Sequence, residues 1–177
     1  MAATTLSRPA ADEYDTYYAG YIAGVPDQNL LDLLSGQIEE TAALLARVPE
    51  ARAGWAYAPG KWTIKEVVGH LADAERIMAY RALRIGRADT TPLPGFEQDD
   101  YVRAGDFDTR LLADLAREFQ AIRRTTIELF QGLGPAAFLR RGTASGMPVS
   151  VRALAYIIAG HERHHVEVLK TRYGLDG

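Results

Sequence analysis

The stretch Thr63-Ile-Lys-Glu-Val-Val-Gly-His-Leu-Ala-Asp-Ala-Glu-Arg-Ile-Met-Ala-Tyr-Arg-Ala-Leu-Arg-Ile-Gly86 has the pattern of one long amphipathic helix. Thr63, with Glu66 three residues later, has the form of a capping box, which predicts that the helix begins here. Apolar residues then recur at helical spacing, at Ile64, Val67, Leu71, Ala74, Met78 and Ile85. Such a stripe needs other elements to cover it, so the fold is decided by what else in the chain has the same period.

Three further segments show this period. The first runs from Leu30 to Val48, after Pro26 and Asp27, which suit a helix start. The last follows Ser150, a candidate N-cap, and ends at Gly174. Between them, after Asp108 and Thr109 and before Gly132, lies a stripe of Leu112, Leu115, Phe119, Ile122, Thr126 and Leu129. No stretch alternates with period two, so we expect an all-α four-helix bundle with at most a short hairpin in a loop.

The connections predict the order of the helices. Residues 49–62, 87–108 and 133–149 are longer than the ~2–8 residues usual between antiparallel neighbours in a bundle. The middle connection, rich in Pro, Gly and Asp, can span the bundle and make the second and third helices parallel. We therefore expect an up-down-down-up bundle in a single domain, 1–177, with the tyrosine-rich residues 1–26 packing on it as an N-terminal extension.

Composition narrows the functional classes. The chain has 177 residues, a formal charge of −3 and no long basic run, which argues against nucleic acid and anionic lipid as partners. No segment approaches the roughly 20 apolar residues of a membrane span, and the start lacks the apolar core of a secretory signal, so we expect a cytoplasmic protein. The chain has no cysteine, so any metal must bind to His, Asp or Glu.

All four histidines fall on two of the expected helices. His161 and His165 are four residues apart, about 40° around the axis, so they project from one face, and that face carries the apolar stripe. His70 lies at the edge of the buried face of the helix 64–86, whereas His164, about 60° from His161, is expected to be exposed or to lie behind the site.

Three inward-facing imidazoles need partners, because a buried unpaired ring nitrogen costs of order 1–3 kcal/mol. A divalent transition metal supplies a common partner, and three ligands leave a position for water or substrate. We therefore expect one metal on His70, His161 and His165. The alternative is that each ring is an ordinary core histidine.

Residues 161–165 also satisfy HExxH, in which Glu162 would be the general base of a metalloprotease. Only twelve residues follow His165, and they contain no further histidine, so the match is formal. Glu66 and Asp73 lie on the polar side of His70 and are candidates to orient its ring, as are Glu162 and His164 near the other two rings.

Two further features point to a pocket. Arg81, on the same line of the helix as His70, could hold an anionic substrate group or form a salt bridge to a loop acid. Tyr14, Tyr17, Tyr18 and Tyr21 are expected to form an apolar lid, with pocket lining as the alternative.

The segment Gly60-Lys-Trp-Thr-Ile-Lys-Glu-Val-Val-Gly-His-Leu-Ala-Asp-Ala-Glu-Arg76, together with His161-x-x-x-His165, resembles the DinB-like (DinB/YfiT) proteins. The resemblance covers about residues 14–173. It implies an up-down-down-up bundle, often a homodimer, with zinc or nickel on His70, His161 and His165. It also implies chemistry like that of the thiol-dependent transferases and the mycothiol-dependent isomerase of that family.

Three hypotheses follow. The first is a metal-dependent enzyme, with transfer to a low-molecular-weight thiol as the leading reaction and hydrolysis as the second. Another is a non-catalytic metal-binding or stress-response module, in which the ion pins two helices together. The third is a structural bundle without metal.

Overall fold

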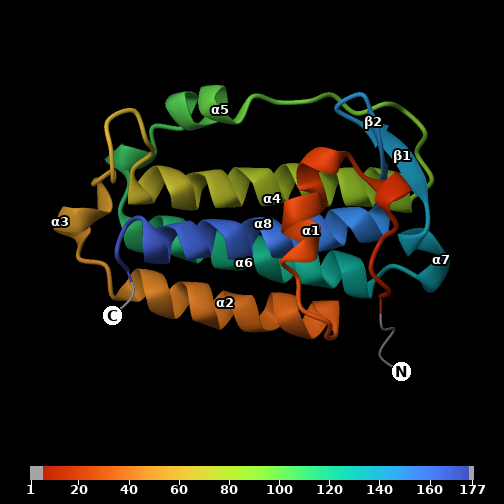
Figure 1. Cartoon of the computed structure of the whole chain (residues 1–177), viewed down its shortest axis with the longest axis horizontal. Helices are drawn as coiled ribbons and strands as arrows, with labels where there is room; N and C mark the ends of the chain where they lie inside the picture. The colour runs from red at the N-terminus through yellow and green to blue at the C-terminus, as the bar shows by residue number, and fades with distance from the viewer. Residues whose placement is uncertain (1–5, 176–177) are drawn as a thin grey trace.

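Four long helices form a bundle in the computed structural model, which describes residues 6–175. They are α2 (Leu30–Ala46), α4 (Ile64–Gly86), α6 (Leu112–Gln131) and α8 (Val151–Thr171). Each of α2 and α4 packs against both α6 and α8. Figure 1 shows α4 and α6 running in the same direction, with α2 and α8 opposed to them. The predicted up-down-down-up bundle is confirmed.

The interior of the bundle changes character along its length. One apolar cluster fills the end that holds Leu34, Phe130 and Leu154, and a second fills the other end, around Ile64 and Leu115. Between the two clusters lie buried polar side chains contributed by all four helices: Gln37, Thr41, His70, Glu75, Arg123 and Glu162. The functional question therefore concerns the middle of the bundle.

Local side chains fix three of the four helix starts. Thr63 caps α4 in a capping box with Glu66, and Ser150 caps α8 by accepting from the amide of Ala153 at 3.0 Å; both caps were predicted. The start of α2 is displaced from the predicted Pro26 and Asp27, because the side chain of Asn29 accepts from the amides of Leu31 and Asp32.

Helix α6 has no capping side chain of its own. The carboxylate of Glu50 accepts from the amide of Leu112 at 3.1 Å, so a residue of α3 (Glu50–Ala53) caps α6. The predicted stripe of α6 is correct at four of its six positions: Leu112, Leu115, Phe119 and Thr126 are buried. Ile122 and Leu129 are half-buried, whereas Arg123, Ile127 and Phe130 face the core. The stripe was wrong there because an arginine occupies a core position.

The crossover from α4 to α6 contains α5 (Gln98–Ala104) and the 3₁₀ helix η3 (Phe107–Thr109). It runs along one side of the bundle in Figure 1. After α6 come α7 (Pro135–Phe138) and a hairpin of β1 (Arg141–Ala144) and β2 (Met147–Ser150), antiparallel with Arg141 opposite Ser150. The amide of Leu93 donates to the carbonyl of Thr143 at 2.9 Å, so the hairpin holds the crossover in place.

The N-terminal segment, residues 6–25, lies against α8. It contains the 3₁₀ helices η1 (Ala11–Glu13) and η2 (Thr16–Tyr18) and the short helix α1 (Ala19–Ala23), which crosses the bundle in Figure 1. Glu13 pairs with Arg152 in the first turn of α8, and the hydroxyl of Tyr156 donates to the carbonyl of Leu6. Residues 1–5 of the predicted extension lie outside the described residues.

Gly160 permits the close approach of α1 to α8. A Cβ atom built at this position would overlap the carbonyl group of Tyr21. Because glycine has no side chain, the backbone of α1 rests directly on α8, one residue before His161. Within residues 6–175, no helix is long and apolar enough to cross a membrane.

Candidate metal centre and its two cavities

Three imidazole rings meet in the middle of the bundle. The Nε2 atom of His161 lies 3.0 Å from Nε2 of His70 and 3.2 Å from Nε2 of His165. One nitrogen from each ring can be chosen so that all three lie within 4.8 Å of one another. The pair on α8 thus shares one face, and the ring from α4 joins it, as the spacing predicted.

Burial keeps these three rings neutral. Desolvation lowers the pKa of His70 to about 4, against a small opposing effect of Asp99. Desolvation, with the neighbouring rings of His70 and His164, lowers the pKa of His165 to about 3. The pKa of His161 is lowered well below its usual value, first by desolvation and then by the surrounding histidines. Neutral imidazoles have the lone pairs that a metal ion requires.

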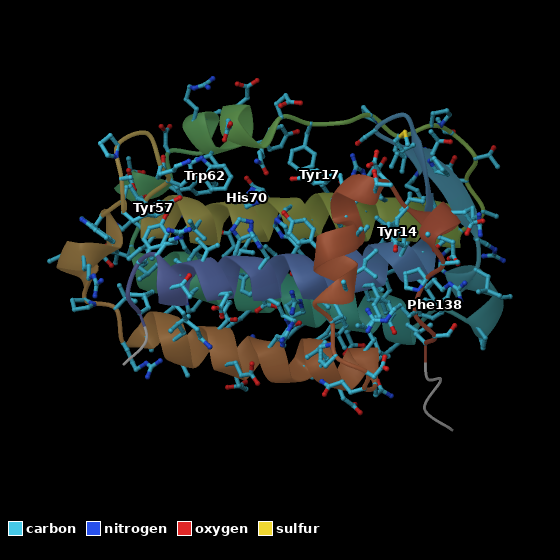
Figure 2. The ribbon with its side chains drawn as sticks, in the orientation of Figure 1. Tyr14, Tyr17, Tyr57, Trp62, His70 and Phe138 are labelled. Atoms are coloured by element: carbon cyan, nitrogen blue, oxygen red, sulfur yellow. The ribbon has the colours of Figure 1, made fainter. Side chains whose placement is uncertain are left out.

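Aromatic rings hold the imidazoles in place. Trp62, just before α4, has its ring centroid 4.7 Å from that of His70 and stacks nearly parallel to His165 at 6.3 Å. Tyr21 of α1 lies edge-on to His161 at 5.5 Å. Figure 2 shows Trp62 beside His70, with Tyr17 farther along the same side of the bundle. The rings therefore have little freedom to turn away from one another.

Two cavities open on opposite sides of the three rings. The first, about 300 Å³, lies along α4 and α8 toward the hairpin; its lining includes His70 and His161, together with Tyr17, Tyr18 and Tyr21. The second, about 380 Å³, lies toward the other end of the bundle and is lined by His164, His165, Trp62 and Tyr57, among others. Gln98 of α5 borders both. The imidazoles thus stand between two spaces, each large enough for a small organic molecule.

Next to the histidines, Arg123 of α6 forms the centre of a buried ion network. Its Nε and second terminal nitrogen donate to the two carboxylate oxygens of Glu75 at 2.7 and 2.8 Å. Its other terminal nitrogen donates to Glu162 at 2.5 Å, and Thr41 donates to the second oxygen of Glu162 at 2.6 Å. Burial opposes the charge of Arg123, but the two carboxylates outweigh burial and raise its pKa. Arg123, Glu75, Glu162 and Thr41 therefore tie the four helices together.

The model of the DinB superfamily matches residues 33–169, which include α4 and α6, nearly all of α2 and α8, and the three histidines. This chain belongs to the DinB superfamily. No curated protein matches it in sequence. Membership therefore rests on the family pattern, together with the bundle order described above.

Two solved structures share the bundle of this DinB superfamily chain. YfiT from Bacillus subtilis, described as a probable metal-dependent hydrolase with an unusual four-helix bundle topology, superposes with a TM-score of 0.71 at 16% identity, covering 95% of this chain and 94% of YfiT. A mycothiol-dependent maleylpyruvate isomerase superposes with a TM-score of 0.65 at 16% identity, covering 82% of this chain and 61% of the isomerase. At such identities, the likeness shows the fold alone.

The remaining predicted site residues of this DinB superfamily chain lie in varied places. Glu66 accepts from the amide of Thr63, and Asp73 pairs with Arg76, so both serve α4 and its neighbours rather than the imidazoles. Glu162 lines the first cavity, but its carboxylate is bound to Arg123 and Thr41. Because its carboxylate is already bound, Glu162 is not free to act as the general base that the HExxH motif would require. His164 is exposed and borders the second cavity.

Two parts of the site were not singled out from the sequence. Trp62 was used only as part of the family motif, although it contacts two of the three imidazoles. The Arg123 network had one available signal: Arg123 comes four residues after Phe119 and three before Thr126, which places a charge on the buried face of α6. Tyr17, Tyr18 and Tyr21 line the first cavity, so they are pocket-lining residues, which was the alternative to a simple apolar lid.

Proposed function

We propose that the chain is a metal-dependent enzyme of the DinB superfamily in which His70, His161 and His165 hold one divalent transition-metal ion, zinc or nickel. The observation that carries the proposal is the meeting of three neutral imidazole nitrogens between two cavities. The leading reaction is transfer of an electrophilic substrate to a low-molecular-weight thiol.

The three rings fit a metal ion in their spacing and chemistry. Nitrogen ligands about 2.0–2.1 Å from a tetrahedral zinc ion lie roughly 3.3–3.4 Å from one another. Two of the three separations, 3.0 and 3.2 Å between Nε2 atoms, are within a few tenths of an ångström of this value, and the ligand atoms of all three rings lie within 4.8 Å of one another. A neutral imidazole has one donor and one acceptor, so Nε2 of His161 cannot satisfy both neighbouring nitrogens by hydrogen bonding. A shared cation resolves this conflict.

The chain's own residues supply orientation and exclusion of water. Trp62 and Tyr21 fix the rings from two sides, and the tyrosines of the N-terminal segment cover the first cavity. A divalent ion held by three imidazoles lowers the pKa of a water or thiol in its open position, which yields a nucleophile near neutral pH. The absence of cysteine from the chain means that a thiol substrate must enter from outside.

The two cavities favour a reaction with two organic substrates. Hydrolysis requires one organic substrate and water, so one cavity suffices. In a transfer, the thiol and the electrophile must reach the same centre together, and a separate cavity for each would hold both beside the three histidines. The likeness to a mycothiol-dependent isomerase supports the same choice. Hydrolysis is the second candidate, because YfiT is described as a probable metal-dependent hydrolase and shares nearly the whole fold.

Metal content tests the ligand set. We expect untagged protein to bind one equivalent of zinc or nickel, measured by elemental analysis after dialysis. His161→Ala should lose stoichiometric metal, because it removes the central ring. His164→Ala is the matched control: it removes an exposed histidine of the same helix and should keep one equivalent. Equal metal in wild type and His161→Ala would overturn the proposed site.

A product assay tests the reaction. Metal-loaded protein is incubated with electrophiles, with and without several small thiols, and the products are separated by mass. Thiol adducts that need both metal and protein support transfer, whereas hydrolysed products formed without thiol support the second candidate. Bound metal that raises the melting temperature without either product would favour a non-catalytic metal-binding module.

A further inference from the structure

Arg81 is a buried cation without a carboxylate partner. Its side chain lies on α4 and is 3% exposed. Its acceptors are all neutral: the carbonyl of Pro94 at 2.8 Å, the hydroxyl of Ser145 at 3.0 Å and the sulfur of Met78 at 3.7 Å. Tyr18 lines a small cavity together with Arg81. Within residues 6–175, no carboxylate oxygen lies within 4.0 Å of its nitrogens.

The contrast with Arg123 makes this unusual. Both guanidinium groups are buried in one bundle, but Arg123 has two carboxylates within hydrogen-bonding distance. A buried charge that lacks an opposite charge is costly, and such groups in native proteins call for an explanation. A purely structural strut between α4 and the crossover needs only the hydrogen bonds to Pro94 and Ser145, which a neutral donor could supply.

Arg81 borders the space that leads to the histidines. A cavity of about 110 Å³, lined by Arg81, Tyr18, Ser145 and others, shares Tyr17, Tyr18, Met78, Ser145 and Ile157 with the first cavity. Eleven residues separate His70 from Arg81, so the two lie on one face of α4, about 16 Å apart along its axis. The contact of Arg81 with Met78, three residues earlier, shows that its guanidinium group folds back toward His70.

The hairpin presents Ser145 to Arg81 through an uncommon backbone. Ser145 has φ 54° and Gly146 has φ 77°, both in the left-handed region that a tight hairpin turn requires. Asparagine, aspartate or glycine usually occupies the first of these positions, whereas serine adopts it rarely. The Ser145 hydroxyl accepts from Arg81 and keeps its own O–H free to donate. Tyr18 likewise offers a hydroxyl donor at the same place.

Asp15 is the acid that could neutralise Arg81 from within the chain, because it lines the same small cavity. However, its carboxylate accepts from the amide of Tyr17 at 2.8 Å and caps η2. It forms no ion pair with Arg81 within the described residues, so the place beside the guanidinium group is left to an incoming anion.

We propose that Arg81, with the hydroxyl groups of Tyr18 and Ser145, binds the carboxylate of an elongated substrate whose other end lies at the three histidines. This assignment rests on the proposed function, because it says which residues bind the other end of the same substrate. The apolar walls formed by Met78, Ile157 and the tyrosine rings suit a hydrocarbon portion between the two ends. Guanidinium groups are the side chains best matched to carboxylates.

A binding experiment that requires no catalysis tests this assignment. Hexanoate and hexanamide have nearly the same shape, and only the first has a charge. We measure their dissociation constants by NMR titration of metal-loaded wild type, Arg81→Met, Arg81→Lys and His161→Ala. We expect wild type to bind hexanoate at least about tenfold more tightly than hexanamide. Arg81→Met should lose this preference, and Arg81→Lys should retain part of it.

His161→Ala separates the carboxylate site from the metal. If the preference survives in this variant, Arg81 and not a metal ion recognises the carboxylate, even where no reaction is found. If it disappears in His161→Ala but persists in Arg81→Met, the carboxylate binds at the histidines and the assignment is overturned. Arg84→Met, which changes an arginine paired with Asp89 outside the cavities, is the matched control and should keep the preference.

The assignment stays testable if Arg81→Met fails to fold. Tyr18→Phe and Ser145→Ala each remove one hydroxyl and leave the arginine in place. Each should weaken the binding of hexanoate severalfold without weakening the binding of hexanamide. An unchanged ratio in both variants would overturn the proposal.

Discussion

Two polar clusters are buried side by side in the middle of the bundle, and their completeness differs. The Arg123 network and the three imidazoles are joined through the peptide bond between His161 and Glu162. In the network, each nitrogen of Arg123 has an oxygen acceptor, and the carboxylates of Glu75 and Glu162 have donors. In the histidine cluster, three Nε2 atoms face one another without donors enough to satisfy them.

The difference separates a cluster that the chain completes by itself from one that, under the proposed function, takes a metal ion as its partner. Helix position and sequence spacing do not distinguish the two clusters, and burial does so only in part: the Arg123 network and His70 are buried, whereas His161 and His165 are half-buried. What distinguishes them is whether the chain supplies every partner. The Arg123 network is closed by four helices and needs nothing from outside, whereas the histidines border two cavities and lack a common partner. The predictions below test this contrast.

The largest expected effect comes from removing the arginine of the Arg123 network. Arg123→Met leaves the carboxylates of Glu75 and Glu162 buried without a counter-charge, and breaking a buried pair in this way costs about 3–5 kcal/mol of unfolding free energy. Urea denaturation of the metal-free protein measures it. Arg117→Met is the control, because Arg117 pairs with Asp114 at the surface, and should cost less than about 1 kcal/mol.

A triple variant shows whether charge is the cause. Glu75→Gln and Glu162→Gln added to Arg123→Met remove the two uncompensated charges, so much of the lost stability should return. If Arg123→Met costs no more than Arg117→Met, the network does not hold the bundle together.

The next effect should depend on metal. At a free metal concentration a hundredfold above the dissociation constant, binding stabilises the native state by about 2.7 kcal/mol. Wild type should gain this stability and His161→Ala should not, as measured by urea denaturation with zinc and with chelator. His164→Ala should gain as wild type does. By contrast, the stability that Arg123→Met loses should be the same with zinc and with chelator. If His161→Ala also lost the same stability under both conditions, the histidine cluster would be structural like the Arg123 network.

The sequence predicted the open cluster better than the closed one, for a physical reason. His161 and His165 share a face because of their helical spacing, and an apolar stripe shows which face turns inward. These are local properties, and so are the caps at Thr63 and Ser150. The prediction that His70 would join the pair needed its position at the edge of the buried face of α4.

The Arg123 network depends on contacts between distant parts of the chain. Its arginine belongs to α6, its carboxylates to α4 and α8, and Thr41 to α2. The spacing of the apolar residues assigned Ile122 and Leu129 to the core of α6 and left Arg123 out of it. Only the three-dimensional pairing with Glu75 and Glu162 makes a buried arginine tolerable at that position.

A smaller effect should follow from moving α1, which lies beside the histidine cluster, away from α8. Gly160→Ala places a methyl group against the carbonyl of Tyr21, so α1 must move away, at a cost of about 1–3 kcal/mol. Gly36→Ala is the control, because Gly36 is exposed in α2 with no atom within 4 Å of an added Cβ. That control should gain up to about 1 kcal/mol. Metal stoichiometry should persist in both variants, since neither changes the imidazoles. Equal stability of the two would show that α1 does not rest on α8.

The smallest effect concerns how the N-terminal cover responds to acid. The hydrogen bond from Arg152, although opposed by burial, lowers the pKa of Glu13 from 4.5 to about 2. A carboxyl whose pKa is lower in the folded state stabilises that state above its unfolded pKa and loses this contribution as pH falls toward its folded pKa. Wild type should therefore exceed Glu13→Gln by about 1–2 kcal/mol near neutral pH, because Arg152 borders solvent and the full shift is not realised. Urea denaturation should show this difference shrinking between about pH 4.5 and pH 2.

Asp12→Asn, which changes the exposed partner of Arg141, should show a much smaller change. A Glu13→Gln difference that stays constant over this range would mean that packing, not the charge of Glu13, anchors the segment over the histidines.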